Sequence, residues 1–402
     1  MKKSFLLVVL IVFSGNLLLA QRPRCLDDVE YALTLLKEVP RAKKYIDECF
    51  QGNESSADVW LVRANVYIQL CEYEIERSKK ESKYVIRWPQ ALIIANESFY
   101  RAVEINPNVK PSRGLIDSKD GQLLTAPVIH DMAAKAMDNK KYTEAVNLLN
   151  LVIRSYKAEA KKYAINLAIA YLDLSNCYKA LGDEANEKKL LQDAAKINLA
   201  IPDIYLNLYD IYLKENDTIK CGEILTQAKK VLPDSLATNV KSYELDYLSM
   251  IGDTAKLKTT AINMFEQFKD KPAVISIIIN HLINIKEYQS SEKMLEEGLI
   301  ISPDDVKLLQ QMAYRFNCEA LDFITLKDEK LKEKPKKYIE AEAALNKANE
   351  IFETARVWTE KAYTIDPDDR DNNIMYSRIL VRLNLEIPAE LQEKVDSYFK
   401  RQ

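Results

Sequence analysis

The chain has 402 residues, 48% of them apolar, which excludes a disordered chain and allows a large buried core. Its 8 glycines and 13 prolines are few, whereas sheets with tight hairpins and phosphate-binding loops need glycine for positive φ or close backbone approach. The scarcity of glycine therefore predicts a mainly helical protein. The net charge of −3 excludes a strongly basic surface, so we do not expect the protein to bind nucleic acid.

The first segment, residues 1–20, predicts a secretory signal peptide. Lys2 and Lys3 precede an apolar run that ends at the small residue Ala20. A retained membrane anchor is the alternative, but the polar and small residues at 14–16 interrupt the run and favour cleavage. We therefore expect an exported protein, periplasmic or otherwise associated with the cell envelope, with no membrane span after cleavage.

Two cysteines bracket the segment that follows. Helical spacing of apolar residues predicts helices over 26–37 and 41–49, with a turn near Pro40. Antiparallel packing of these helices places Cys25 near Cys49. Because disulfides persist in exported proteins, we predict that the two cysteines are bonded.

A turn pattern then recurs along the chain at an interval close to 34 residues. The turns read LGDE, ENDT, IGDT and IKEY, beginning at Leu181, Glu215, Ile251 and Ile285. Stops such as IPD, LPD and ISPDD alternate with these turns, and apolar residues recur at helical spacing between them. Each unit is therefore predicted to be a helix–turn–helix pair, and such pairs at this period are typical of tetratricopeptide repeats.

The chain resembles the tetratricopeptide repeat family position by position over most of residues 26–385. The family places small residues where two helices touch and large ones beside them. The unit that starts at Pro202 fills these places with Tyr205, Leu208, Tyr209, Tyr212, Cys221, Leu225, Ala228 and Pro233. Other units place small residues at Ala64, Ala95, Ala102, Ala133, Ala145, Ser175, Ala194, Ser291, Ala313, Ala355 and Ala362. The resemblance implies an all-α, right-handed superhelical solenoid of about eight to nine antiparallel helix pairs.

Composition divides the chain further. The stretch NPNVKPSRGLIDSKDGQLLTAP holds three prolines and two of the 8 glycines, which predicts a linker over 107–126. The linker is expected to separate N-terminal helix pairs with a long insert (21–106) from a solenoid of repeats (127–385). Residues 386–402 predict a C-terminal capping helix.

Two stretches, 70–90 and 318–340, separate the two helices of their units. They are interpreted either as longer helices with charged flanks or as protruding elements that bind a partner.

The residues that carry catalytic chemistry do not gather into a recognisable motif. His130 and His281 are the only histidines, and neither belongs to a metal-binding spacing. Cys221 occupies a small-residue place, so we expect a packing role instead of an activated thiol; like Cys71, Cys177 and Cys318 it is expected to stay free. We therefore expect no catalytic residue, metal or cofactor, and a protein that is not an enzyme.

The resemblance also implies a concave surface, lined mainly by first helices, that binds a peptide or a protein. One position of each first helix is expected to face this concave surface. In six of the repeats it is occupied by Asn65, Asn176, Asp210, Asp246, Asn280 and Tyr314. Asn and Asp side chains suit contacts with an extended peptide backbone, because together they offer hydrogen-bond donors and acceptors. The alternative is that these residues are merely solvated.

Three functions remain open from the sequence. The first is a protein–protein interaction scaffold of the bacterial cell envelope. The second is a glycan- or nutrient-binding protein, for which Trp88 in the first insert is the relevant residue; the third is an enzyme with a site on the inserts.

Short Asp–Ser/Thr–apolar patterns at 217–219, 234–236 and 253–255 resemble glycosylation acceptors of Bacteroides-like bacteria. The partner and the oligomeric state stay undetermined.

Overall fold

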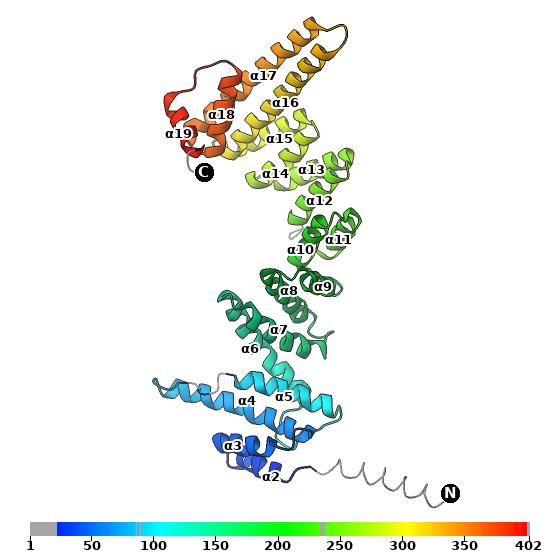
Figure 1. The fold of residues 1–402 in the computed structure, drawn as a ribbon, viewed down its shortest axis with the longest axis vertical. Helices are drawn as coiled ribbons and strands as arrows, with labels where there is room; N and C mark the ends of the chain where they lie inside the picture. The colour runs from blue at the N-terminus through cyan, green and yellow to red at the C-terminus, as the bar shows by residue number, and fades with distance from the viewer. Residues whose placement is uncertain (1–21, 86, 88–89, 234–237, 400–402) are drawn as a thin grey trace, which may run out of the picture. The chain divides into compact units, whose positions relative to one another are not determined.

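The computed structural model describes residues 22–85, 87, 90–233 and 238–399 (Figure 1). Every regular element within these ranges is a helix, which confirms the predicted all-α fold. The predicted signal peptide, residues 1–20, lies outside the described residues, as do Trp88 and the short pattern at 234–236. The chain divides into two compact units, residues 1–208 and 209–402, and each is described by itself.

The first unit is built from paired helices. Its elements are α2 (Cys25–Glu30) with a π-helical segment η1 (Tyr31–Leu35), α3 (Val39–Phe50), α4 (Ala57–Lys80), α5 (Ala91–Ile105), α6 (Ser118–Asp138), α7 (Tyr142–Lys157), α8 (Ala164–Leu181) and α9 (Glu184–Ala195). Helix α10 (Pro202–Lys214) contains the boundary between the units.

The second unit continues in the same way. Its further elements are α11 (Thr218–Val231), α12 (Thr238–Met250), α13 (Thr254–Phe268), α14 (Pro272–Asn284), α15 (Tyr288–Ile301), α16 (Val306–Lys332), α17 (Tyr338–Ile365), α18 (Arg370–Arg382) and α19 (Ala389–Phe399). The eighteen α-helices of the described residues thus follow one another as nine pairs, in agreement with the predicted number.

The recurring turns have a common backbone geometry. In each of the four turns a residue with positive φ follows the first helix, at Lys286 in the fourth. In the first three turns the next residue is an aspartate, which caps the second helix by accepting a hydrogen bond from a backbone N–H three positions on, whereas Glu287 in the fourth makes no such bond. The φ values are 76° at Gly182, 57° at Asn216 and 73° at Gly252. The capping distances are 3.1 Å at Asp183, 3.1 Å at Asp217 and 3.0 Å at Asp253. This pairing of two residues explains why the turns are visible in the sequence.

The core depends on small residues at the contacts between helices. Cys221 is fully buried in α11, and its sulfur lies 3.9 Å from the carbonyl oxygen of Tyr209 in α10. Gly298 in α15 has a similar place, because a Cβ there would lie 3.0 Å from the Ile275 side chain and 3.2 Å from that of Leu308. The other small residues singled out by the repeat pattern are also buried, so helix pairs approach closely wherever one side chain is short.

The predicted linker 107–126 differs from the structure in its second half. Residues from Ser118 onward belong to α6, which Asp117 caps by accepting from the backbone N–H of Lys119 at 2.9 Å. Gly121 lets α5 and α6 approach closely, because a Cβ there would overlap the ring of Phe99. Pro127 lies inside the helix. Gly and Pro often break helices, but here one serves packing and the other is accommodated within a helix.

Both predicted inserts consist largely of extended helix. Residues 70–80 belong to α4, and residues 318–332 belong to α16, which lies beside α17 (Figure 1). The turn between α16 and α17 carries an ion-pair network in which Lys330 and Lys337 each contact Glu333 and Glu340, at 2.8 to 3.6 Å. The interpretation as longer helices with charged flanks therefore holds for α16 and α17.

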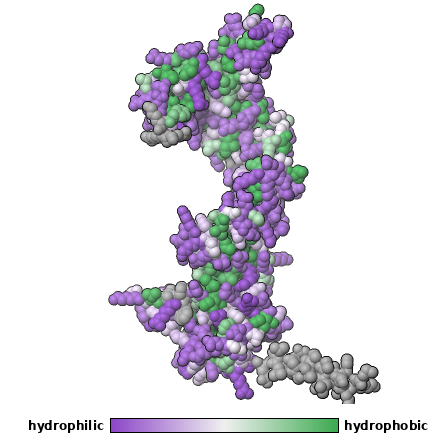
Figure 2. All heavy atoms as spheres, in the orientation of Figure 1, coloured by the Kyte–Doolittle hydropathy of each residue, from purple (hydrophilic) through white to green (hydrophobic). Residues whose placement is uncertain are grey.

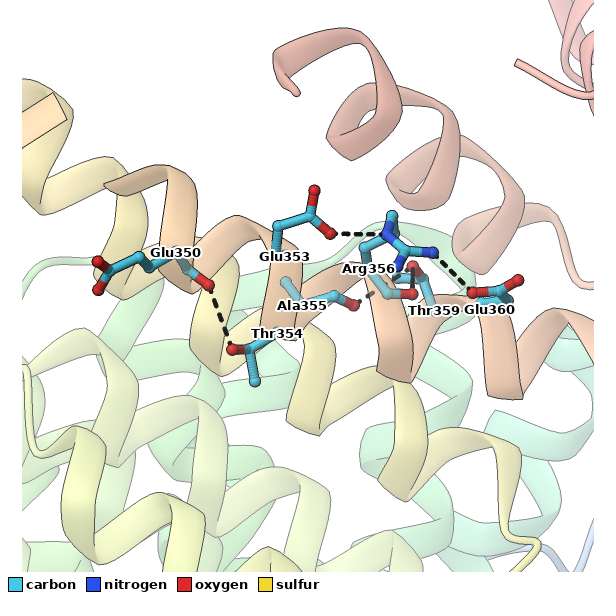
Figure 3. Close-up of polar contacts among 7 residues, drawn as sticks. All are labelled: Glu350, Glu353, Thr354, Ala355, Arg356, Thr359 and Glu360. Carbon is cyan, nitrogen blue, oxygen red and sulfur yellow. Dashed lines mark hydrogen bonds and ion pairs between the residues drawn. The ribbon is translucent and has the colours of Figure 1, made fainter. Parts of the chain in front are cut away.

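Helix α17 is supported by contacts along its own length (Figure 3). The guanidinium of Arg356 lies 2.9 Å from the Glu353 carboxylate and 2.8 Å from that of Glu360, which are one turn away in either direction. The Thr359 hydroxyl donates to the Arg356 carbonyl at 2.9 Å. Pairs of this spacing stabilise a helix that extends beyond its neighbours, because they do not require burial.

The predicted disulfide is present. Cys25 at the start of α2 is bonded to Cys49 near the end of α3, with a Cα–Cα distance of 5.7 Å. The first helix is shorter than predicted, since η1 follows α2 and Lys37 takes a positive φ of 56°. Cys71, Cys177, Cys221 and Cys318 are free, as expected; Cys177 and Cys221 are buried and the other two half-buried.

Removal of the disulfide is expected to destabilise the N-terminal helices. The bond closes a loop with a sequence separation of 24 residues, and such loops are worth about 3 kcal/mol in the free energy of unfolding. The double variant C25S/C49S should lose that amount in urea unfolding followed by circular dichroism. Reduction of the wild type should give the same loss, and an unchanged midpoint would contradict a structural role for the bond.

The Cys221 position is expected to tolerate a smaller side chain and not a larger one. Cys221→Leu should reduce the free energy of unfolding by about 1–3 kcal/mol, because the extra atoms overpack the contact with α10. Cys221→Ala should change it by less than about 1 kcal/mol. Glu223→Leu, on the exposed face of the same helix, is the matched control. Equal losses for both leucine variants would contradict the packing role.

Candidate functional site

The six residues predicted to line a groove all lie on first helices of their pairs. They are Asn65 in α4, Asn176 in α8, Asp210 in α10, Asp246 in α12, Asn280 in α14 and Tyr314 in α16. The contacts of their side chains divide them into several groups.

Asn65 does not face a groove. Its side chain is 2% exposed, and its amide nitrogen donates to the carbonyls of Leu61 and Ile116, each at 3.0 Å. Its carbonyl oxygen accepts from the Ile116 N–H at 2.6 Å. The two bonds with Ile116 tie the segment before α6 to α4, so this side chain is structural and cannot contact a ligand.

Asp210 and Asp246 connect consecutive first helices. The hydroxyl of Tyr243 in α12 lies 3.4 Å from the Asp210 carboxylate, and Nε2 of His281 in α14 lies 3.2 Å from that of Asp246. The first unit has an equivalent contact, of 2.7 Å, between its only histidine in α6 and an aspartate of α8, His130 and Asp173. Both histidines of the chain are therefore used between repeats. The carboxylates keep lone pairs that could accept from a ligand.

Asn176 and Asn280 are more available. Asn176 is half-buried and Asn280 is exposed, and neither side chain makes a hydrogen bond within the described part of the chain. They stay candidate contacts on α8 and α14.

Tyr314 lies in a pocket between α16 and α18, which we call the α16/α18 pocket. Its volume is about 460 Å³, within the range that accommodates small ligands or a few side chains. The lining residues are Gln310, Gln311, Tyr314, Asn317 and Leu321 from α16, and Asp371, Ile374, Met375, Arg378 and Arg382 from α18. In each helix they recur every three or four residues, so each helix presents one face to the pocket.

The chemistry of this pocket is mixed. Two side-chain atoms, Nε2 of Gln310 and Oε1 of Gln311, are buried and have no hydrogen-bond partner in the described residues. Arg378 is exposed, and the guanidinium of Arg382 lies 5.4 Å from the ring centre of Phe352. Neither arginine forms an ion pair within the described chain. The pocket therefore offers positive charge, amide groups and apolar surface to a ligand.

A second pocket of about 490 Å³ lies in the first unit between α3 and α4. Its charges are largely satisfied by the chain itself, as in the 2.6 Å contact between Lys43 and Asp47. The buried Glu74 accepts from the Tyr84 hydroxyl at 2.7 Å and from the Arg87 N–H at 2.6 Å. Glu74 thus anchors the segment after α4, and the pocket has less capacity left for a ligand.

The free thiols are not arranged for nucleophilic catalysis. Burial raises the pKa of Cys177 to about 11, and burial also raises the pKa of Cys221. A raised pKa lowers the thiolate fraction, whereas a catalytic cysteine needs it increased. Among the described residues no group of three His, Cys, Asp or Glu side chains could hold a metal ion. No helix in these ranges is long and apolar enough to span a bilayer.

The visible face of the molecule is mainly hydrophilic, with hydrophobic residues in scattered patches (Figure 2). The candidate site is therefore better defined by the α16/α18 pocket than by an apolar surface. Sequence reasoning identifies Tyr314 but not its neighbours. The spacing of Gln310, Tyr314 and Asn317 along one helix face is a signal that could reveal them.

Comparison with known proteins identifies no family: no family model and no curated protein matches this chain. The solved structures that it resembles include YrrB, a TPR protein with an unusual peptide-binding site, at 14% identity and a TM-score of 0.35, covering 53% of this chain and 97% of that one. The C-terminal part of a TPR repeat-containing protein from Cytophaga hutchinsonii has 17% identity and a TM-score of 0.37, covering 66% and 99%. Yeast Tom70 has 11% identity and a TM-score of 0.37, covering 92% and 86%.

The buried thiols are expected to resist alkylation in the folded protein. A pKa of about 11 in place of 9.0 makes the Cys177 thiolate about 100-fold scarcer near neutral pH. Iodoacetamide at about pH 7.5 should therefore label Cys177 at least about 100-fold more slowly in native protein than in urea, and it should also label Cys221 more slowly in the native state, because burial raises the pKa of that thiol. Mass spectrometry of the peptides measures both rates. Rapid native labelling of Cys221 would instead indicate an activated thiol.

Proposed function

We propose that this protein is a non-catalytic scaffold of the bacterial cell envelope that binds a peptide or protein partner along the inner faces of its first helices. The observation that carries the proposal is the α16/α18 pocket, where two consecutive first helices present buried, unpartnered amide groups and arginines without an ion pair in the described chain. A protein surface that leaves such groups unsatisfied is suited to a ligand that satisfies them.

The stacked helix pairs support the proposal in a second way. Each pair shares its core with the next, so the first helices form a continuous surface within each unit. In the second unit, Asn280 and the carboxylates of Asp210 and Asp246 add hydrogen-bonding groups to that surface, as Asn176 does in the first. Such a surface binds an extended segment by many moderate contacts and needs no catalytic group.

The envelope location is supported by the N-terminal sequence and by the disulfide. Lys2 and Lys3 followed by an apolar run are typical of a secretory signal. Cys25 and Cys49 are bonded, and disulfides of this kind persist in oxidising compartments.

Glycan binding is less well supported by the described residues. Trp60 packs edge-to-face on Phe50 with ring centres 4.6 Å apart, and its indole N–H donates to the Glu54 carbonyl at 2.7 Å. Trp358 packs against the core of the second unit. These two tryptophans serve packing and do not form an exposed aromatic platform.

Photo-cross-linking in cells that naturally make the protein tests this function. Benzoylphenylalanine replaces Tyr314 or Asn280, which belong to the proposed binding surface. Glu296 on α15 is the control, because it is exposed on a second helix. We expect one recurrent protein adduct from Tyr314 and Asn280, found in the envelope fraction, and none from Glu296.

Two results would contradict the binding of a partner along the first helices. Adducts from Glu296 alone would place the partner on the second helices instead of the first. The absence of adducts from all three positions, with the protein folded and present in normal amount, would argue against a bound protein. Recovery of the adduct in the cytosolic fraction would refute only the location.

A further inference from the structure

We propose that the α16/α18 pocket binds an extended partner segment in which an Asp or Glu side chain stands next to an apolar side chain. The inference rests on the proposed function and specifies the chemistry of the ligand at this site. It is carried by the charges, the amide groups and the apolar surface of the pocket.

The charge of the ligand follows from the two pocket arginines. Arg378 and Arg382 stand one turn apart on the same face of α18, where both side chains line the pocket. Two other arginines of this unit are held by carboxylates: Arg315 lies 2.9 Å from Glu292 and 2.8 Å from Glu319, and Arg356 lies between Glu353 and Glu360. Arg370, outside the pocket, has no ion pair in the described chain and lies over the Tyr398 ring. The pocket arginines have no such partner in the described chain. A guanidinium is a rigid fork of donors that matches a carboxylate.

The single acid of the pocket cannot neutralise them. Asp371 stands seven residues before Arg378 on α18, which corresponds to about 10 Å along a helix. The α18 side of the pocket is therefore acidic at the start of the helix and basic at its end. A ligand carboxylate is favoured at the Arg378 and Arg382 end and disfavoured beside Asp371.

The amide groups select a peptide. Nε2 of Gln310 is a donor and Oε1 of Gln311 is an acceptor, and both are buried without a partner in the described residues. These two atoms are covered in the structure, so a rotation of the glutamine side chains has to accompany their pairing with the alternating C=O and N–H groups of an extended peptide backbone. An acyl chain has no donor for Gln311, and an inorganic anion has no apolar part for the rest of the pocket, so their chemistry fits less well.

The apolar part of the pocket accounts for the second ligand side chain. Ile374 and Met375 are half-buried on α18, and Leu321 lines the pocket from α16. Tyr314, which also lines it, is 39% exposed. Methionine adapts its shape to different side chains, so this region suits Leu, Ile, Met or Phe without selecting one.

The shape of the pocket indicates an internal segment instead of a chain end. All its lining residues come from α16 and α18, over 310–321 and 371–382, about 17 Å of helix each. That length matches about five extended residues. No described residue of a third helix lines the pocket to close its ends, so a chain can pass through. The ligand carboxylate is therefore assigned to a side chain.

A peptide array tests the inference with the full mature chain. The probes are random peptides of about ten residues, acetylated at the N-terminus and amidated at the C-terminus, with a matched set that ends in a free carboxylate. Bound peptides should be enriched in Asp or Glu adjacent to Leu, Ile, Met or Phe. For the strongest binder, R378Q and R382Q should each raise the Kd about five-fold, as expected for a partly exposed ion pair.

The matched control is R370Q, which removes the same charge from the same helix outside the pocket and should leave the Kd unchanged. Replacing the peptide Glu by Gln should weaken binding to the wild type and have little further effect on R378Q/R382Q, which is the signature of a direct pair. Thermal unfolding midpoints establish that the variants are folded.

The outcomes separate the two proposals. Bound peptides without acidic enrichment, or Kd values insensitive to both arginines but raised by N280A or D246A, would overturn the inference and leave the scaffold function standing. No binding by any peptide would overturn both. Binding confined to the probes with a free C-terminal carboxylate would overturn the assignment to an internal side chain.

Discussion

The close approach of helices at small side chains is the constraint on which the structure depends. Two helices approach closely only if one contributes Ala, Ser, Cys or Gly at the contact, and large residues then fill the space beside it. Cys221 and Gly298 are two examples. Cys221 is fully buried, and a Cβ added to Gly298 would touch two neighbouring side chains. The spacing of first helices, and hence the groups they present on their inner faces, follows from these contacts.

Much of the fold could be predicted because its signals are local. A left-handed residue followed by a capping aspartate, as at Gly182 and Asp183, marks a turn within two positions. The disulfide was predictable because its cysteines bracket one short hairpin. The role of Gly121 was not, because it depends on Phe99, a residue of another helix. Nothing in the adjacent sequence distinguishes a glycine for close packing from a glycine for a turn.

The candidate site was less predictable, for a related reason. The repeat pattern marks one inward place per unit, which leads to Tyr314 but also to Asn65, whose environment is set by the segment around Ile116. The α16/α18 pocket needs side chains from two helices that are not consecutive in the chain, because the 28-residue helix α17 and its two flanking turns lie between them. Which residues of α18 face Tyr314 depends on the packing of α17 against both helices, and periodicity alone does not determine that register.

The polar contacts between successive repeats distinguish the α16/α18 pocket from the other steps of the second unit. Asp210 with Tyr243 links α10 to α12, and Asp246 with His281 links α12 to α14. At the next step Asp322 of α16 accepts hydrogen bonds from the Tyr288 hydroxyl and the Lys286 ammonium, each at 2.9 Å, and so reaches the turn between α14 and α15.

Between α16 and α18 the described residues form no such hydrogen bond or ion pair. The polar side chains that face this step without such a partner are those of Gln310 and Gln311 on α16 and of Arg378 and Arg382 on α18. Buried polar atoms without a partner are costly, and the exposed guanidinium of Arg378 keeps its donors available, so a ligand that supplies partners to both kinds of group would be stabilised here. The step from α16 to α18, which no hydrogen bond or ion pair of the described chain bridges, is therefore the step at which we propose that a partner segment binds.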